Sequence, residues 1–126
     1  MSTILVLDDD DLFRHYLVTL LERAGYKVHA LHNGADVRRM LERWRFDAVV
    51  TDLYMPHADG LETLRQVREV APGLPVIGIT SAHHDDPCVR AMTVLGAELV
   101  LTKPLDEDMF LAALRRAVAR TRNRAC

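Results

Sequence analysis

The sequence predicts an α/β fold in which helices cover both faces of a doubly wound parallel sheet, and three observations lead to this prediction. Five short runs of apolar or β-forming residues alternate with five segments whose apolar residues recur at helical spacing. The central runs are apolar throughout, which is typical of parallel strands buried on both faces. The chain has 126 residues, the length of a single domain, and no internal repeat or linker interrupts the alternation.

Each predicted strand is a short run bounded by charged or turn-forming residues. The second run alternates polar with apolar residues and is rich in β-formers, as expected of an edge strand. The other four runs are largely aliphatic, which favours buried strands. The predicted strands cover residues 3–7, 27–31, 48–50, 76–79 and 99–101.

Each predicted helix combines an apolar face with signals at its ends. Asn33 can cap the second helix, and Pro87 suits the first turn of the fourth. Gly25 and Gly96 end the first and fourth helices, and the acidic residues at 106–108 favour the start of the fifth. The residues expected on the inward faces are Phe13, Leu17, Leu20, Leu21 and Ala24; Val37, Met40, Leu41 and Trp44; Leu61, Leu64 and Val67; Val89 and Met92; and Phe110, Ala113, Leu114 and Ala117.

Composition excludes several classes of protein. A formal net charge of -2 argues against a dedicated binder of nucleic acid or of anionic membranes. The longest apolar runs are too short to cross a bilayer, and Met1 to Thr3 lead directly into the first strand, so we expect a cytoplasmic protein without a signal peptide. Cys88 and Cys126 lie far apart and are expected to be free thiols rather than a disulfide or a zinc site.

Chemically suitable side chains follow four of the five predicted strands: Asp8 and Asp9, then Asp52, Thr80 and Lys103. The carboxyl ends of parallel strands share one edge of the sheet, so these groups can converge. Each has a simpler explanation when taken alone, because an acidic cluster is typical of a helix N-terminus and lysine of an exposed surface. The combination of all four is much harder to obtain by chance.

If these groups converge, their chemistry is that of phosphoryl transfer. Neighbouring carboxylates repel unless a cation lies among them, and an all-oxygen pocket suits Mg²⁺. Lys103 would add a positive charge and Thr80 a hydroxyl donor for the oxygens of a transferring phosphoryl group. Asp52 would then be the nucleophile that forms an acyl phosphate, and it needs no general base because a carboxylate is already ionised at neutral pH.

With these residues in this order, the sequence resembles a known family, the receiver domains of two-component response regulators, which include the single-domain chemotaxis regulator. The resemblance covers about residues 4–118. It is carried by Leu-Asp-Asp after the first strand, Asp-x-x-Met-Pro-x-x-Asp-Gly starting at Asp52, Thr-Ser after the fourth strand and Lys-Pro after the fifth. The resemblance implies a flavodoxin-like sheet of five strands in the order 2-1-3-4-5, flanked by five helices.

The resemblance also implies a function and a set of site residues. Asp52 would accept phosphate from the phosphohistidine of a histidine kinase or a histidine phosphotransfer protein, and Thr80 and Lys103 would contact the phosphoryl group. A downstream protein would bind the face made by the fourth helix, fifth strand and fifth helix. The implied Mg²⁺ ligands are Asp8, Asp9, Asp52 and the backbone carbonyl of Tyr54. The family also suggests a cis peptide bond between Lys103 and Pro104.

Three positions bear on how the switch would work: one departs from the family pattern, and two affect the stability of the acyl phosphate in the family. Many members have an aromatic residue where this chain has Val100, so activation would have to be relayed in another way. Tyr54 and Ala82 occupy positions that adjust the lifetime of the acyl phosphate in the family. Tyr54 could shield the phosphoryl group and Ala82 has no group to orient water, so we expect slow self-dephosphorylation.

Two further features have simpler explanations. His83, His84, Asp85 and Asp86 could bind a transition metal but are more typical of a solvated loop, and His57 is likewise expected to be an ordinary loop residue. The arginines of the last helix invite a nucleic-acid role, yet cations near a helix C-terminus complement its dipole, so we expect no direct binding of nucleic acid. These arginines are Arg115, Arg116, Arg120, Arg122 and Arg124.

The leading hypothesis is therefore a signalling switch that at most catalyses its own phosphorylation and dephosphorylation. One alternative is a phosphohydrolase of the haloacid-dehalogenase type, since Asp8 and Asp10 have its spacing, although the chain is short for the cap of such an enzyme. The other is a pseudo-receiver that takes no phosphate. We expect a receiver domain over residues 1–122 and a short tail over 123–126, which favours a stand-alone module without separating it from a receiver cut from a longer regulator.

Overall fold

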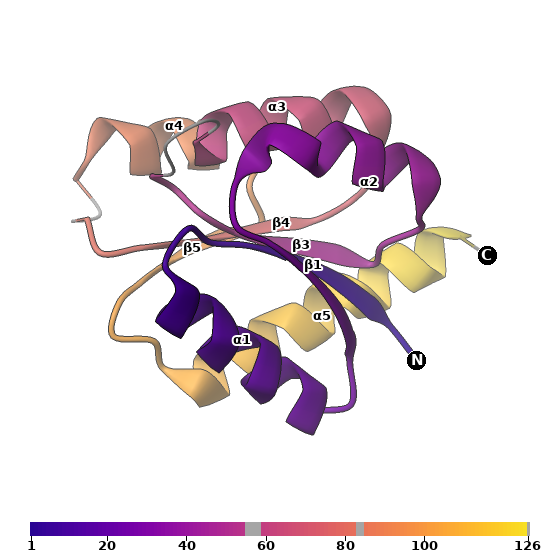
Figure 1. Cartoon of the computed structure of the whole chain (residues 1–126). Helices are drawn as coiled ribbons and strands as arrows, with labels where there is room; N and C mark the ends of the chain where they lie inside the picture. Colours follow the sequence, from indigo (N-terminus) through magenta and orange to yellow (C-terminus); the bar gives the residue numbers. More distant parts are fainter. Residues whose placement is uncertain (55–58, 83–84, 126) are drawn as a thin grey trace.

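The computed structural model describes residues 1–54, 59–82 and 85–125, and only the backbone of residues 122–125. One parallel sheet runs through the molecule in the order β2-β1-β3-β4-β5, which confirms the predicted fold class and strand order (Figure 1). Its strands are β1 (Thr3–Leu7), β2 (Lys27–Leu31), β3 (Ala48–Asp52), β4 (Val76–Thr80) and β5 (Leu99–Thr102).

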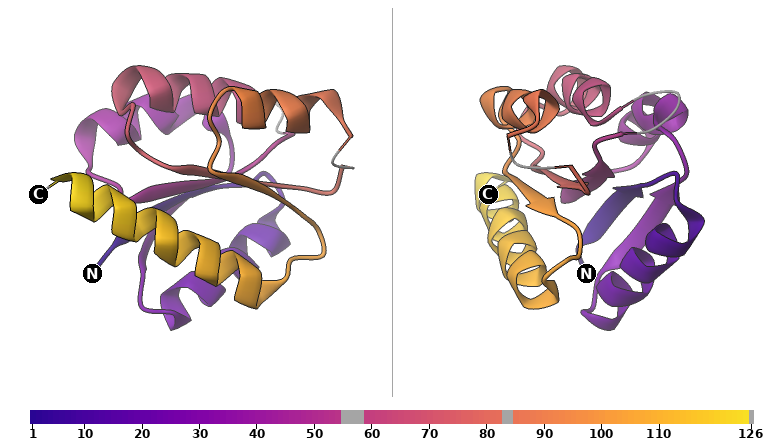
Figure 2. Two further views of the ribbon diagram at one scale, coloured as in Figure 1. Left: turned by 180° about the vertical axis from the view of Figure 1, so that it is seen from behind. Right: turned by 90° about the vertical axis from the view of Figure 1, so that its left-hand side faces the viewer.

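Helices cover both faces of this sheet. Figures 1 and 2 show α1 and α5 on one face and α2, α3 and α4 on the other. The helices are α1 (Asp11–Arg23), α2 (Val37–Arg43) with a preceding 3-10 turn η1 (Gly34–Asp36), α3 (Gly60–Val70), α4 (Pro87–Val94) and α5 (Glu107–Ala125). None of the helices in the described residues is both long enough and apolar enough to cross a membrane.

The strands send alternate side chains into two separate cores because successive residues of a strand point to opposite faces. In β3, Val49 packs with the core beneath α2, α3 and α4, whereas Ala48 and Val50 pack with the core beneath α1 and α5. Both groups are fully buried. This double burial explains why the central strands are apolar at every position.

Most helices begin at an aspartate whose carboxylate accepts a hydrogen bond from a backbone N–H of the first turn. This cap fixes where each chain segment leaves the sheet edge and turns into its helix. The capping residues are Asp10 for α1, Asp59 for α3, Asp86 for α4 and Asp106 for α5. Gly25 and Gly96, which follow α1 and α4, have φ angles of 96° and 99°, a conformation that favours glycine.

Two expectations about the helices were wrong in detail. Trp44 was expected to face inward, but α2 ends at Arg43 and Trp44 has an extended backbone with 48% of its surface exposed. Ala24 is exposed because it already forms the C-cap of α1. The helix α5 extends to Ala125, so residues 123–125 are helical, and the boundary of the receiver domain at residue 122 stays a prediction.

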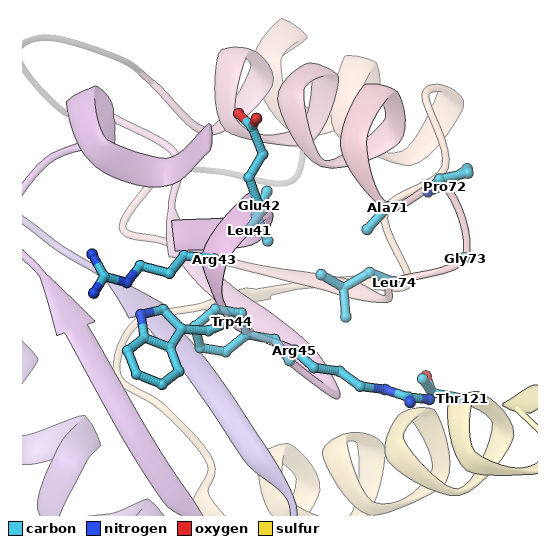
Figure 3. A pocket seen from close by; sticks show the side chains of 11 residues that line it. Leu41, Glu42, Arg43, Trp44, Arg45, Ala71, Pro72, Gly73, Leu74 and Thr121 are labelled. Carbon is cyan, nitrogen blue, oxygen red and sulfur yellow. The ribbon is translucent and has the colours of Figure 1, made fainter. Parts of the chain in front are cut away.

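Trp44 instead packs on the edge of the sheet. Its ring stacks on His29 of β2 with 5.7 Å between centroids, and Arg43 lies over it at 5.8 Å. Trp44 and Arg45 border a groove of about 510 Å³ at the amino ends of the strands, which extends to Thr121 of α5 (Figure 3). Trp44 therefore marks the end of the sheet opposite the predicted site.

Candidate functional site

The predicted site residues follow four strands at the carboxyl edge of the sheet, toward the left of Figure 1. Asp8 and Asp9 come directly after β1, and Asp52 is the last residue of the neighbouring strand β3. The strand order reverses between β1 and β3, which is where doubly wound sheets bind their ligands. Thr80 ends β4, and Lys103 follows β5.

Three carboxylates gather at this edge. Asp8, Asp9 and Asp52 each offer an oxygen within 4.8 Å of the others. The Asp8 side chain is 1% exposed, and its Oδ1 accepts a hydrogen bond from the amide of Asp10 at 2.9 Å. Its buried Oδ2 has no hydrogen-bond partner among the described residues. Because buried carboxylate oxygens are normally satisfied, this oxygen and its neighbours form a donor set that could hold an oxygen-liganded cation.

Lys103 brings a positive charge to the carboxylates. Its Nζ lies 3.7 Å from Asp8 Oδ2 and 3.9 Å from Asp52 Oδ2, too far for a hydrogen bond but close enough for charge attraction. The ammonium group also lies 4.1 Å from the centre of the Phe13 ring, whose face attracts cations. The peptide bond from Lys103 to Pro104 is cis.

The carboxylates are difficult to ionise together in the absence of a cation. Burial, followed by the negative charge of Asp8, raises the pKa of Asp52 from its ordinary 3.8 to about 6. Lys103 and the backbone N–H groups of Tyr54 and Leu53 oppose this shift without cancelling it. Burial also raises the pKa of Asp8, although the Asp10 amide and Lys103 lower it. A cation bound here would remove the main obstacle to full ionisation.

Thr80 occupies the next strand along the edge. It is fully buried, and its hydroxyl accepts a hydrogen bond from the amide of Ala82 at 3.0 Å. Asp52 pairs with Ile79, so Thr80 lies one residue beyond the partner of the acidic residue. The hydroxyl proton has no acceptor in the described residues and could serve a ligand at this edge.

Residues 4–115 match the model of a protein family described as the response regulator receiver domain. This chain belongs to that family. It is a receiver domain, the signalling domain of response regulators in two-component systems.

Known relatives and solved structures agree with this assignment. The receiver is 37% identical over 111 residues to the transcriptional regulatory protein GlrR of Escherichia coli, covering 88% of this chain and 25% of GlrR. It is 36% identical over 119 residues to the response regulator MprA of Mycobacterium ulcerans, covering 94% of this chain and 51% of MprA. The chain therefore spans a quarter to a half of these curated relatives.

Two solved structures illustrate the similarity of the fold. The receiver superposes on full-length FixJ from B. japonicum with a TM-score of 0.86 and 33% identity, covering 98% of this chain and 61% of that one. It superposes on a response regulator receiver domain protein from Clostridium thermocellum with a TM-score of 0.87 and 29% identity, covering 97% and 98% of the two chains.

The receiver also holds Tyr54 next to the acidic cluster. The amide of Tyr54 points at Asp52 Oδ1 from 3.5 Å, and its hydroxyl donates a hydrogen bond to Asp86 Oδ1 at 2.6 Å. Sequence reasoning missed this role of Asp86 and assigned it to a solvated loop. The Asp-Pro pair that begins α4 was a signal for a helix cap, but nothing in the sequence indicated that the cap would also meet Tyr54.

Val100 stands where an aromatic residue was expected from the family pattern, and neighbouring side chains pack closely around it. Val100 is half-buried in β5 and pairs with Gly78 of β4. A Cβ atom at Gly78 would lie 2.9 Å from Leu53 Cδ1 and 3.4 Å from Val100 Cγ2, so these side chains occupy the space above the glycine. His57, His83, His84 and Cys126, to which the sequence assigned minor roles, lie outside the described residues, and Cys88 is a free, half-buried thiol.

Proposed function

We propose that Asp52 is the phosphoryl acceptor of this receiver and takes its phosphoryl group from the phosphohistidine of a histidine kinase or a histidine phosphotransfer protein. The observation that carries the proposal is the cluster of Asp8, Asp9 and Asp52 oxygens within 4.8 Å of one another. Lys103 lies beside this cluster. No other described group of histidine, cysteine, aspartate or glutamate residues comes together in this way.

The chemistry of the transfer follows from these groups. A carboxylate oxygen of Asp52 attacks phosphorus, a P–O bond forms, and the P–N bond of the phosphohistidine breaks. The electron pair of that bond stays on the imidazole nitrogen, and the ring, protonated on its other nitrogen, leaves as a neutral imidazole. The ammonium of Lys103 offsets the charge on the phosphoryl oxygens, and the Thr80 hydroxyl donates a hydrogen bond to one of them.

We propose Mg²⁺ as the cation, held by Asp8, Asp9, Asp52 and the backbone carbonyl of Tyr54. Asp8 Oδ2 supports this assignment, because it is a buried acceptor without a hydrogen-bond partner among the described residues and Lys103 lies too far away to donate one. When bound, Mg²⁺ neutralises charge on the carboxylates and on the phosphoryl oxygens. The chain's own contribution is to hold the carboxylates at the fixed strand ends, which lowers the cost of assembling the site.

We further propose that the phosphorylated state decays slowly for a member of this family. Tyr54 lies beside the acceptor and can limit the approach of water, and Ala82 has no side-chain group that could orient a water molecule for attack. The decay of label from Asp52 after removal of a small phosphodonor measures this lifetime. A half-life of seconds would contradict the proposal.

The output surface is proposed to be the face made by α4, β5 and α5. A groove of about 510 Å³ lies between α4 and β5, and Val100 lines it. Val94, which also lines the groove, is 84% exposed and the adjacent Leu95 is 55% exposed, which gives a protein partner an apolar surface. Arg120 of α5 pairs with Glu98 on the same face. We propose protein partners and no direct contact of this chain with nucleic acid; a cytoplasmic location remains a prediction of the sequence.

Incubation with acetyl phosphate and Mg²⁺ tests the proposed acceptor. We expect one stoichiometric phosphoryl group, detected by intact-protein mass spectrometry, and its loss in Asp52→Asn. Continuous release of phosphate that disappears in Asp8→Asn but survives in Asp52→Asn would instead indicate a phosphohydrolase. Absence of label in the wild-type chain would indicate a pseudo-receiver, and either result would overturn the proposal.

A further inference from the structure

Tyr54 makes one contact through its backbone and one through its side chain. Its backbone amide lies 3.5 Å from Asp52 Oδ1, and its hydroxyl donates to Asp86 Oδ1 at 2.6 Å. The first contact is at the end of β3 and the second at the start of α4. Tyr54 therefore links the end of β3, where the proposed acceptor lies, to the start of α4.

Asp86 is a fixed anchor for this ring. The same Oδ1 atom accepts the backbone N–H of Cys88 at 2.8 Å and so caps α4. Pro87 follows at the start of the helix and restricts the backbone there. Because the cap of α4 fixes the carboxylate of Asp86, this group orients the Tyr54 hydroxyl more precisely than a freely rotating carboxylate would.

The electrostatics of the pair fit a hydroxyl that donates to an ionised carboxylate. The hydrogen bond to Asp86 is the main reason that the pKa of Tyr54 lies above its ordinary value. The same bond is the main reason that the pKa of Asp86 lies below its ordinary value. Hydrogen bonds to a charged acceptor are stronger than neutral ones, although exposure to water weakens this one.

We propose that Asp86 is a positioning residue that holds the Tyr54 ring across the carboxyl edge of β3 and thereby limits the access of water and small phosphodonors to Asp52. The inference rests on the proposed role of Asp52 as acceptor. Tyr54 is 47% exposed, and its hydroxyl bond to Asp86 restrains the outer part of the ring. Without that bond the ring can rotate away into solvent.

Four variants test the positioning role. Tyr54→Phe keeps the ring and removes the hydroxyl. Asp86→Ser keeps a good helix cap, but its shorter side chain withdraws the acceptor from Tyr54. Asp86→Asn keeps an acceptor for both partners, and Asp106→Ser is the matched control, because it makes the same change at the cap of α5.

Two rate constants are measured in the full chain with Mg²⁺: labelling by acetyl phosphate, and loss of label after the donor is removed. We expect both to rise by about threefold or more in Tyr54→Phe and Asp86→Ser, which is the effect of losing one hydrogen bond. A purely structural defect would slow labelling instead. The double variant should be no faster than either single variant, because both changes break the same bond.

Asp86→Asn should stay within about twofold of the wild-type chain, and so should Asp106→Ser. The proposal is overturned if Asp86→Ser leaves both rates unchanged, if Asp86→Asn matches Asp86→Ser, if the control rises equally, or if the two effects simply add. A wild-type chain that takes no label would overturn the proposed function itself. A labelled wild-type chain with unaltered variants would overturn only the role of Asp86.

Discussion

At the scale of single residues, the ionised side chain of Asp52 destabilises the folded chain when no cation is bound. Its pKa is about 6 in the folded chain against an ordinary value of 3.8, so the folded state binds this proton more tightly than the unfolded state. Between these two pH values the unfolded chain has lost the proton and the folded chain still holds it. The free energy of unfolding therefore falls as the pH rises through this window, and the loss is complete above it.

Asp52→Asn should remove this penalty. We expect the variant to be more stable than the wild-type chain by about 2 kcal/mol at neutral pH, a value reduced for partial access of water, and by much less near pH 4. Urea unfolding without divalent cations, followed by circular dichroism across this pH range, measures the difference.

The control is Asp108→Asn, which removes the same charge from the exposed first turn of α5. The helix dipole favours that charge, so this variant should not gain stability as the pH rises. A difference between Asp52→Asn and the wild-type chain that is the same at both ends of the pH range would contradict the assigned cause.

At the scale of secondary-structure elements, Arg68 of α3 joins segments that are distant in sequence. Its guanidinium donates to the carbonyl of Leu74 at 2.8 Å and to the carbonyl of Gly96 at 2.6 Å. These carbonyls belong to the loop before β4 and to the turn between α4 and β5. Arg68 therefore fixes the two connections at the amino end of the sheet relative to α3.

Arg68→Ala should lower the free energy of unfolding by about 1–3 kcal/mol, because two carbonyls lose a charged donor. Arg65→Ala is the matched control on the same helix. Arg65 pairs with Glu62 and Glu69 at 2.5 Å on an exposed surface, and its loss should cost less than about 1 kcal/mol. Equal losses in the two variants, measured by urea unfolding, would contradict the bridging role of Arg68.

Patterns in the sequence predicted the elements well where periodicity and burial act together. The central strands were predictable because both faces are covered, and the start of α4 was predictable from Pro87 and that of α5 from the acidic residues at 106–108. Trp44 was mispredicted because helical spacing continues past Arg43 in the sequence while the backbone does not. Ring stacking on His29, a tertiary contact, determines where Trp44 lies.

The convergence of Asp8, Asp9, Asp52 and Lys103 was predictable for a related reason. Parallel strands bring their carboxyl ends to one edge, so chain order and strand direction alone bring these residues together. The bond between Tyr54 and Asp86 was not predictable, because the two residues are 32 positions apart and lie in loops whose paths no periodicity describes.

At the scale of the whole molecule, the proposed binding of Mg²⁺ would be linked to folding through the same carboxylates. Mg²⁺ needs these groups ionised, and the folded chain resists that ionisation below about pH 6. Saturating Mg²⁺ should therefore raise the midpoint of thermal unfolding, by more near pH 7 than near pH 5. In Asp52→Asn the increase should be much smaller at both pH values, and an equal increase in that variant would contradict the assigned ligands.

The chain has a single tryptophan, and its place in the fold decides what an optical experiment can detect. Trp44 lies beside His29 and Arg43 at the amino ends of the strands, whereas the proposed acceptor Asp52 is at the carboxyl ends. Indole fluorescence should therefore stay nearly constant on titration with Mg²⁺ or acetyl phosphate and change only when the sheet unfolds. The fluorescence of Trp44 therefore reports whether the protein is folded and does not report whether it is phosphorylated.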